Sequence, residues 1–143
     1  PRCFAEGHPH VGRLFSDSIG AAEDYFRRTR IFPIMHVLGL RRSLAEQYPF
    51  LPAALFKAFN ESKRLAEEAL SDTSATKVTM PFVEDTLNRV HALMGDDPWS
   101  YGLGANAHVL DRFLDYHAAQ GLSPRRVQIE ELFHPSTLEA YSL

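Results

Sequence analysis

The sequence lacks the residues that build covalent or metal frameworks, and it has no long apolar run. Cys3 is the single cysteine among 143 residues, so no disulfide forms within the chain, and no Cys/His spacing resembles a zinc site. The longest apolar stretch, residues 31–40, is interrupted by Pro33 and His36 and is too short to span a bilayer. The net charge of −3 gives no sign of the excess of positive charge that is typical of nucleic-acid-binding proteins. We therefore expect neither a membrane nor a nucleic-acid partner.

The start of the chain lacks an initiator methionine, a basic leader and a signal-type apolar stretch. It opens on residues typical of a loop, so we expect a piece of a longer protein whose N-terminal part is missing. A cytoplasmic location is the expectation for that protein. Hydrophobic residues make up 45% of the chain, with ten Phe, five Tyr and one Trp, which predicts a folded core rather than disorder.

Helical patterns cover most of the sequence. The predicted helices occupy residues 17 or 18 to 29, 43–48, 52–70, 81–94 and 106–120, followed by helical turns at 130–133 and 136–141. Ser43 and Glu46 have capping-box spacing, Pro52 suits a first helical turn, and Gly95 suits a helix end. The side chains predicted to face inward are Ile19, Ala22, Phe26, Leu55, Phe59, Ala66, Ala69, Val83, Leu87, Val90, Met94, Val109, Leu110, Phe113 and Leu114, whereas the charged face of 52–70, which includes Lys63, is predicted to be solvated.

Residues 34–40 are predicted to form a strand. Apolar side chains stand at both alternating positions, which indicates a strand buried on both faces, as in parallel sheets. A lone strand cannot satisfy its own main-chain donors and acceptors, so its partners must lie outside this chain. Residues 11–15 predict a second, short strand. The predicted fold class is α/β, with the fragment itself mostly helical.

Three stretches together resemble the 4,5-dihydroxyphthalate decarboxylase family. They are residues 13–17 with 25–29 and 31–37, residues 96–103 with 106–113 and 120–122, and residues 130–133. Their order and spacing cover nearly the whole chain, and the phrase Phe-Pro-Ile-Met-His at 32–36 is the most specific piece. The chain departs from the family pattern at Arg30, where glycine is expected, at Ser100, where proline is expected, and at Ala105, where a charged residue is expected.

The resemblance implies a two-lobed fold of the type II periplasmic-binding-protein kind. Residues 1–33 are then the tail of the second lobe and the hinge, and residues 34–143 are the return strand and the helical part of the first lobe. The implied partners are a small aromatic carboxylate and the missing N-terminal lobe, and a homo-oligomer is left open.

The implied activity is decarboxylation of 4,5-dihydroxyphthalate to 3,4-dihydroxybenzoate and carbon dioxide. No organic cofactor is expected, because no nucleotide or pyridoxal motif is present. The alternative is a non-catalytic solute-binding protein of a transporter for aromatic or sulfonated anions, since one fold hosts both functions.

Four residues are the candidates for this chemistry. His36 is the catalytic candidate, because imidazole exchanges protons near neutral pH; the alternative is a core histidine bonded to the main chain. Arg13 is the first choice for holding a carboxylate, because guanidinium matches it bidentately, and Arg2 is a weaker one near the terminus. Tyr101 is a candidate donor to a carboxylate or phenol oxygen, with a packing aromatic as the alternative.

No metal is expected. His8 and His10 stand two residues apart in a Gly/Pro-rich loop, but a bare His-x-His is weak as a metal motif, and surface histidines are commoner. Cys3 has no motif for nucleophilic chemistry and is interpreted as inert.

Overall fold

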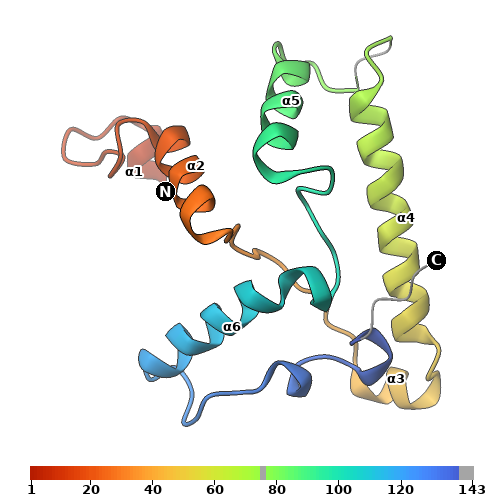
Figure 1. Cartoon of the computed structure of the whole chain (residues 1–143). Helices are drawn as coiled ribbons and strands as arrows, with labels where there is room; N and C mark the ends of the chain where they lie inside the picture. The colour runs from red at the N-terminus through yellow and green to blue at the C-terminus, as the bar shows by residue number, and fades with distance from the viewer. Residues whose placement is uncertain (75–76, 139–143) are drawn as a thin grey trace. The chain divides into compact units, whose positions relative to one another are not determined.

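The computed structural model describes residues 1–74 and 77–138, and over these ranges the chain is mostly helical, as predicted. The helices are α1 (Arg2–Ala5), α2 (Ser18–Thr29), α3 (Arg42–Gln47), α4 (Leu51–Ser71), α5 (Val83–Met94) and α6 (Leu103–Ala119), with 3₁₀ turns η1 (Ile129–Glu131) and η2 (Pro135–Thr137) (Figure 1). The chain divides into two compact units, residues 1–32 and the residues from 33 onward. The assignment of these units to two lobes stays a prediction.

Helix α2 dominates the first unit and has the predicted bounds. The Asp17 side chain caps its start by accepting a hydrogen bond of 2.9 Å from the main-chain N–H of Gly20. At its end, Arg30 has a left-handed backbone with φ 56°, and its guanidinium lies 4.9 Å from the ring centroid of Phe26. Phe26 is the buried side chain of the helix.

Two other predictions for this unit are wrong. Ile19 remains 60% exposed, and Ala22 is also exposed, because only Phe26 of the predicted stripe finds a covering surface. Residues 11–15 form no strand.

The prediction of a buried strand over residues 34–40 is also wrong for this structure. The segment has no regular secondary structure, and residues 34–39 are exposed. A strand is stable only when its N–H and C=O groups pair with a neighbour, and no strand exists among residues 1–74 and 77–138 to provide one. The apolar run therefore does not form the predicted buried strand, and its side chains at residues 34–39 are exposed.

Helices α3 to α5 begin close to the predicted places, with different caps. Arg41, rather than Ser43, precedes α3, and no side chain caps that helix. Pro52 lies buried in the first turn of α4, as expected. Helix α5 begins after Phe82, whose backbone is left-handed with φ 64°, so Pro81 lies before the helix rather than inside it.

The inner faces of these helices agree with the pattern only in part. In α5 all four predicted positions are half-buried, whereas in α4 Leu55 and Ala69 are half-buried and Phe59 and Ala66 are exposed. Among the described residues no helix is both long and apolar enough to cross a membrane.

The best-packed core lies between α6 and the segment after it. Leu110, Leu114 and Ile129 are buried together, with Leu114 only 4% exposed. The half-buried side chains packed around them are Leu103, Ala107, Val127 and Phe133. Helix α6 begins three residues before its predicted start, and Phe113, predicted to face inward, is 58% exposed. Burying side chains of this size stabilises the packing by about 1.5–3 kcal/mol each.

Ion pairs hold the returning segment against α6. Arg126 donates to Asp115 at 2.8 Å and to Asp111 at 3.0 Å, one helical turn apart. Arg125 binds both carboxylate oxygens of Glu131, at 2.7 and 2.8 Å, and the same carboxylate caps η1 by accepting from the main-chain N–H of Gln128 at 2.8 Å. Of the predicted helical turn at 136–141, η2 ends at Thr137, and residues 139–141 lie outside the described part of the chain.

Candidate functional site

The loop between α5 and α6 is tied to α4 by one lysine. Lys63 donates to Oδ1 of Asp97 at 2.6 Å and to the main-chain oxygen of Trp99 at 3.2 Å. Its ammonium also lies 5.2 Å from the ring centroid of Tyr101, within the range of a cation–π contact. Three residues of one loop thus converge on a single cation.

A second polar side chain fixes the same loop from α6. The Asn106 amide donates to the main-chain oxygens of Ser100 and Gly102, both at 2.9 Å. Gly102 has φ 89° and approaches α4 closely, because a Cβ on it would lie 3.2 Å from the Phe56 ring. Glycine suits both conditions, since it has no Cβ and tolerates positive φ. Side chains of α4 and α6 therefore hold the loop 97–102 at the main-chain oxygens of Trp99, Ser100 and Gly102.

Sequence reasoning missed Lys63. The charge run of α4 predicted a solvated lysine, but the Lys63 side chain is only 14% exposed. Two of the three N–H donors of an ammonium are engaged by Asp97 and Trp99. The signal that could have indicated this contact is the loop sequence Asp-Asp-Pro-Trp-Ser-Tyr-Gly. Its acidic and aromatic side chains can both contact a cation from another part of the chain.

Tyr101, a predicted substrate-binding residue, lies in this tied loop. It is 38% exposed, so it is neither buried in the core nor free of packing. Its phenol group has a polar end for donating a hydrogen bond and a ring face that contacts a cation. The Tyr101 phenol is thus a hydrogen-bond donor on a loop whose conformation is held by Lys63 and Asn106.

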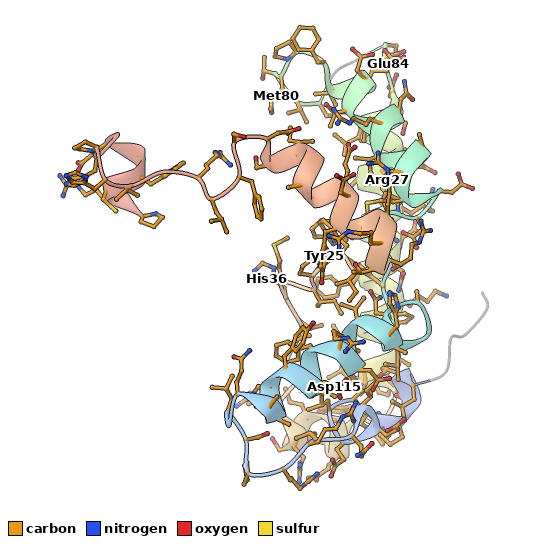
Figure 2. All side chains as sticks on the ribbon, turned by 60° about the vertical axis from the view of Figure 1, so that its left-hand side comes forward. Tyr25, Arg27, His36, Met80, Glu84 and Asp115 are labelled. Carbon is orange, nitrogen blue, oxygen red and sulfur yellow. The ribbon has the colours of Figure 1, made fainter. Side chains whose placement is uncertain are left out.

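His36, the predicted proton-handling residue, lies in the irregular segment after α2, and Figure 2 shows its side chain outside any helix. It is exposed, so the alternative of a core histidine is not what this structure has. Its role in proton transfer stays a prediction.

The two predicted arginines lie in the first unit. Arg13 donates to the Ser18 hydroxyl at 3.3 Å and lies 5.5 Å from the Phe4 ring centroid. Arg2 forms an exposed ion pair with Glu6 at 2.7 Å. Within residues 1–74 and 77–138, Arg13 thus contacts a hydroxyl and an aromatic ring but forms no ion pair, whereas Arg2 is paired with a carboxylate.

The four predicted site residues are divided between the two units of the chain. Tyr101 and His36 belong to the second unit, and Arg2 and Arg13 belong to the first. Their shared role in substrate binding and catalysis remains a prediction.

The two histidines of the first loop contact each other. The rings of His8 and His10 lie 5.8 Å apart, and the His8 ring accepts a hydrogen bond from the main-chain N–H of His10. Within residues 1–74 and 77–138, no three His, Cys, Asp or Glu side chains are grouped to hold a metal ion.

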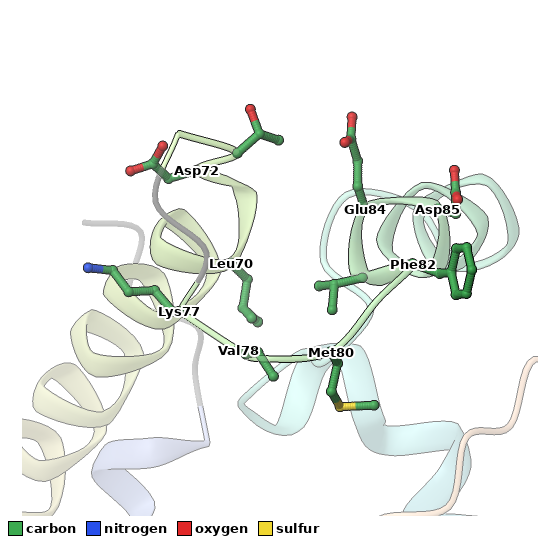
Figure 3. A pocket seen from close by; sticks show the side chains of 10 residues that line it. Leu70, Asp72, Lys77, Val78, Met80, Phe82, Glu84 and Asp85 are labelled. Atoms are coloured by element: carbon green, nitrogen blue, oxygen red, sulfur yellow. The ribbon is translucent and has the colours of Figure 1, made fainter.

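A hollow of about 300 Å³ lies between the end of α4 and the start of α5. Its rim carries three carboxylates, Asp72, Glu84 and Asp85, against one ammonium, that of Lys77. In Figure 3 the side chains of Glu84 and Asp85 point the same way, and Lys77 points away from them. This excess of negative charge repels a dicarboxylate, so the hollow is a poor candidate for the predicted substrate.

The segment after α6 contains a carboxyl group whose pKa is strongly lowered. The side-chain hydrogen bonds from Arg125 and then the main-chain N–H of Gln128 lower the pKa of Glu131 from 4.5 to about 2. This carboxylate caps η1 and serves the packing of that segment.

Comparison with known proteins gives one informative match. No protein-family model matches the chain. The chain is 57% identical, over all 143 residues, to a protein of Comamonas testosteroni named 4,5-dihydroxyphthalate decarboxylase. It spans 43% of the length of that relative. The predicted resemblance is therefore confirmed: over its whole length this chain is similar to part of a member of the 4,5-dihydroxyphthalate decarboxylase family.

Proposed function

We propose that the intact protein containing this chain removes one carboxylate from 4,5-dihydroxyphthalate, giving 3,4-dihydroxybenzoate and carbon dioxide. The observation that carries this proposal is the 57% identity, over all 143 residues, to a protein named for that reaction. The matched region therefore includes residues 32–36 and the loop 96–103.

The chemistry sets three requirements. The bond between the ring carbon and the carboxylate carbon breaks, its electron pair stays on the ring carbon, and a proton takes the place of the lost carbon dioxide. A hydroxyl para to that carbon allows the ring to accept the proton first, through a keto-like intermediate. The protein must hold a dianion, deliver a proton to carbon and manage a phenol proton.

In this proposal His36 moves the proton. It is exposed on an irregular segment, which leaves its ring accessible, and imidazole exchanges protons near neutral pH. Arg13, which contacts the Ser18 hydroxyl and the Phe4 ring, holds a carboxylate, and Arg2 has a secondary role in binding it. Tyr101 donates to a carboxylate or phenol oxygen from the loop that Lys63 and Asn106 tie down.

The proposal extends to the architecture and setting of the intact protein. We propose a two-lobed α/β fold of the type II periplasmic-binding-protein kind, with residues 1–33 and 34–143 in different lobes. Its support is the exposed apolar run at 34–39, which needs a covering surface. The reaction needs no organic cofactor, and the location is cytoplasmic, as suits an enzyme rather than a transport component.

The test compares turnover with binding alone. The intact protein is incubated with 4,5-dihydroxyphthalate without added cofactor, and carbon dioxide and 3,4-dihydroxybenzoate are quantified. Release of both in equal amounts supports the proposal. Tight binding of the aromatic acid without turnover supports the alternative, a non-catalytic solute-binding protein for aromatic or sulfonated anions.

A further inference from the structure

We infer that Lys63 is a positioning residue, which fixes the loop 97–102 so that Tyr101 presents its phenol to a bound aromatic dicarboxylate. This inference rests on the proposed function and adds to it a residue that the motifs did not single out. Lys63 acts through Tyr101 and does not itself contact the substrate.

The first support is the way the Lys63 ammonium is used. Its side chain is 14% exposed, whereas its partner Asp97 is 54% exposed. The cation therefore lies beneath the loop, and its donors at 2.6 Å and 3.2 Å point to loop oxygens. A lysine that held a substrate carboxylate would instead keep its ammonium in the open.

The second support is the position of these contacts along the loop. The Trp99 main-chain oxygen precedes Tyr101 by two residues, and Asn106 fixes the Ser100 and Gly102 oxygens on either side of it. Loop conformations with several satisfied main-chain oxygens lose little further entropy on binding a ligand. Tyr101 is thus pre-organised. Asn106 holds the loop from α6, and Lys63 holds it from α4.

The third support is the direct contact between the two side chains. The ammonium lies 5.2 Å from the Tyr101 ring centroid, so Lys63 limits how the ring turns as well as where the main chain runs. Tyr101 remains 38% exposed, which leaves it reachable by a ligand.

Helix α4 offers a matched control. Lys57 lies on the same helix and is exposed. Lys57→Met removes the same charge and the same number of atoms as Lys63→Met. The difference between the two variants isolates the loop contact from general changes in helix charge.

The experiment is a double-mutant cycle in the intact protein, with phthalate as an unreactive dicarboxylate probe whose Kd is measured by calorimetry. Tyr101→Phe is expected to raise Kd by about tenfold, since a hydrogen bond to a charged group is lost. Lys63→Met is expected to raise Kd about three- to tenfold, and Lys57→Met by less than about twofold. In the Tyr101→Phe background, Lys63→Met is expected to add less than about twofold.

A conservative variant and kinetics complete the test. Lys63→Arg keeps a cation with several donors and is expected to restore Kd to within about twofold, and Lys63→Met is expected to raise KM more than it lowers kcat. Asp97→Asn serves as the second variant if Lys63→Met does not fold, and it is expected to lose its effect in the Tyr101→Phe background as well. Thermal unfolding of each variant corrects for folded fraction.

The outcomes separate this inference from the proposed function. Additive losses in the cycle, or equal effects of Lys63→Met and Lys57→Met, overturn the positioning role while wild-type turnover still supports the decarboxylase. A wild-type protein that binds no phthalate and releases no carbon dioxide from 4,5-dihydroxyphthalate overturns the proposed function and this inference with it.

Discussion

The Lys63 ammonium lies 2.6 Å from the carboxylate of Asp97, a residue 34 positions later in the sequence. This ion pair connects the middle of α4 to the loop that precedes α6. A partly buried cation with two loop partners stabilises a local conformation more than an exposed helical pair does. The pair explains why a loop rich in turn-forming residues has a defined conformation.

Arg30→Gly is expected to stabilise the protein by up to about 1 kcal/mol. Arg30 ends α2 with φ 56°, a conformation that costs a residue with a Cβ about 1–2 kcal/mol and glycine very little. Loss of the Phe26 contact at 4.9 Å offsets part of the gain. Thermal unfolding of the intact protein measures the effect, with Arg28→Gly inside α2 as a control that should destabilise by about 1 kcal/mol. A lower Tm for Arg30→Gly would contradict this explanation.

Acid is expected to loosen the segment that follows α6. Hydrogen bonds from Arg125 and the Gln128 N–H lower the pKa of Glu131 to about 2, below its ordinary value of 4.5. A carboxyl with a lowered folded-state pKa stabilises the fold fully above its unfolded value, and the contribution is lost as pH falls toward the folded value. The loss should therefore lie between about pH 4.5 and 2.

Glu131→Gln is the variant that tests this pH dependence. It is expected to be less stable than wild type at pH 7 and to lose less stability than wild type when pH falls from 5 to 2. Urea unfolding at a series of pH values measures both. Parallel pH profiles for the two proteins would show that Glu131 does not contribute in this range.

The 143-residue chain is expected to associate through its exposed apolar run. Met35, Val37 and Leu38 are 61%, 72% and 63% exposed, and contiguous apolar surface of this kind promotes contact between molecules. Light scattering should give an apparent mass that rises with concentration, and Val37→Lys with Leu38→Lys should reduce the rise. Leu65→Lys, at an exposed position of α4, should not. A monomer at every concentration would contradict this expectation.

His36→Asn is expected to lower kcat by on the order of a hundred- to ten-thousand-fold in the intact protein while changing substrate affinity little. Asparagine has similar bulk and hydrogen-bonding capacity but does not exchange a proton near neutral pH. His36 is exposed, so folding stability should change little. Steady-state assays measure kcat and KM, and thermal unfolding gives the folded fraction of each variant. His10→Asn is the control. Normal turnover per folded molecule would remove His36 from the mechanism.

The bounds of the helices were predicted from the sequence more reliably than the burial of their side chains. The bounds of α2 and α4 came from apolar spacing, a capping aspartate and Pro52, which are local features. The burial of Ile19, Phe59 and Phe113 was predicted wrongly, because burial depends on what covers a face, and spacing reports only the face. Segment 34–40 failed for the same reason, since a strand needs a partner that its own residues do not provide.

In the candidate site, too, local features were predicted from the sequence and a long-range contact was not. The motif that contains Tyr101 was found from sequence, because its aromatic and turn-forming residues are unusual together. Lys63 was missed, because its partner Asp97 is 34 positions away and nothing in a charged helical face marks one lysine as tied to a loop. Long-range contacts of single polar side chains follow from the fold and not from local pattern.

The most direct test of the decarboxylase proposal follows the fate of the carboxylate carbon. The intact protein is given 4,5-dihydroxyphthalate labelled with carbon-13 in both carboxylates, with no cofactor added, and products are followed by nuclear magnetic resonance. The account predicts one labelled carbon dioxide and one 3,4-dihydroxybenzoate, with a single labelled carboxylate, for each substrate consumed. Bound but unchanged substrate, at protein concentrations that saturate it, would contradict the account.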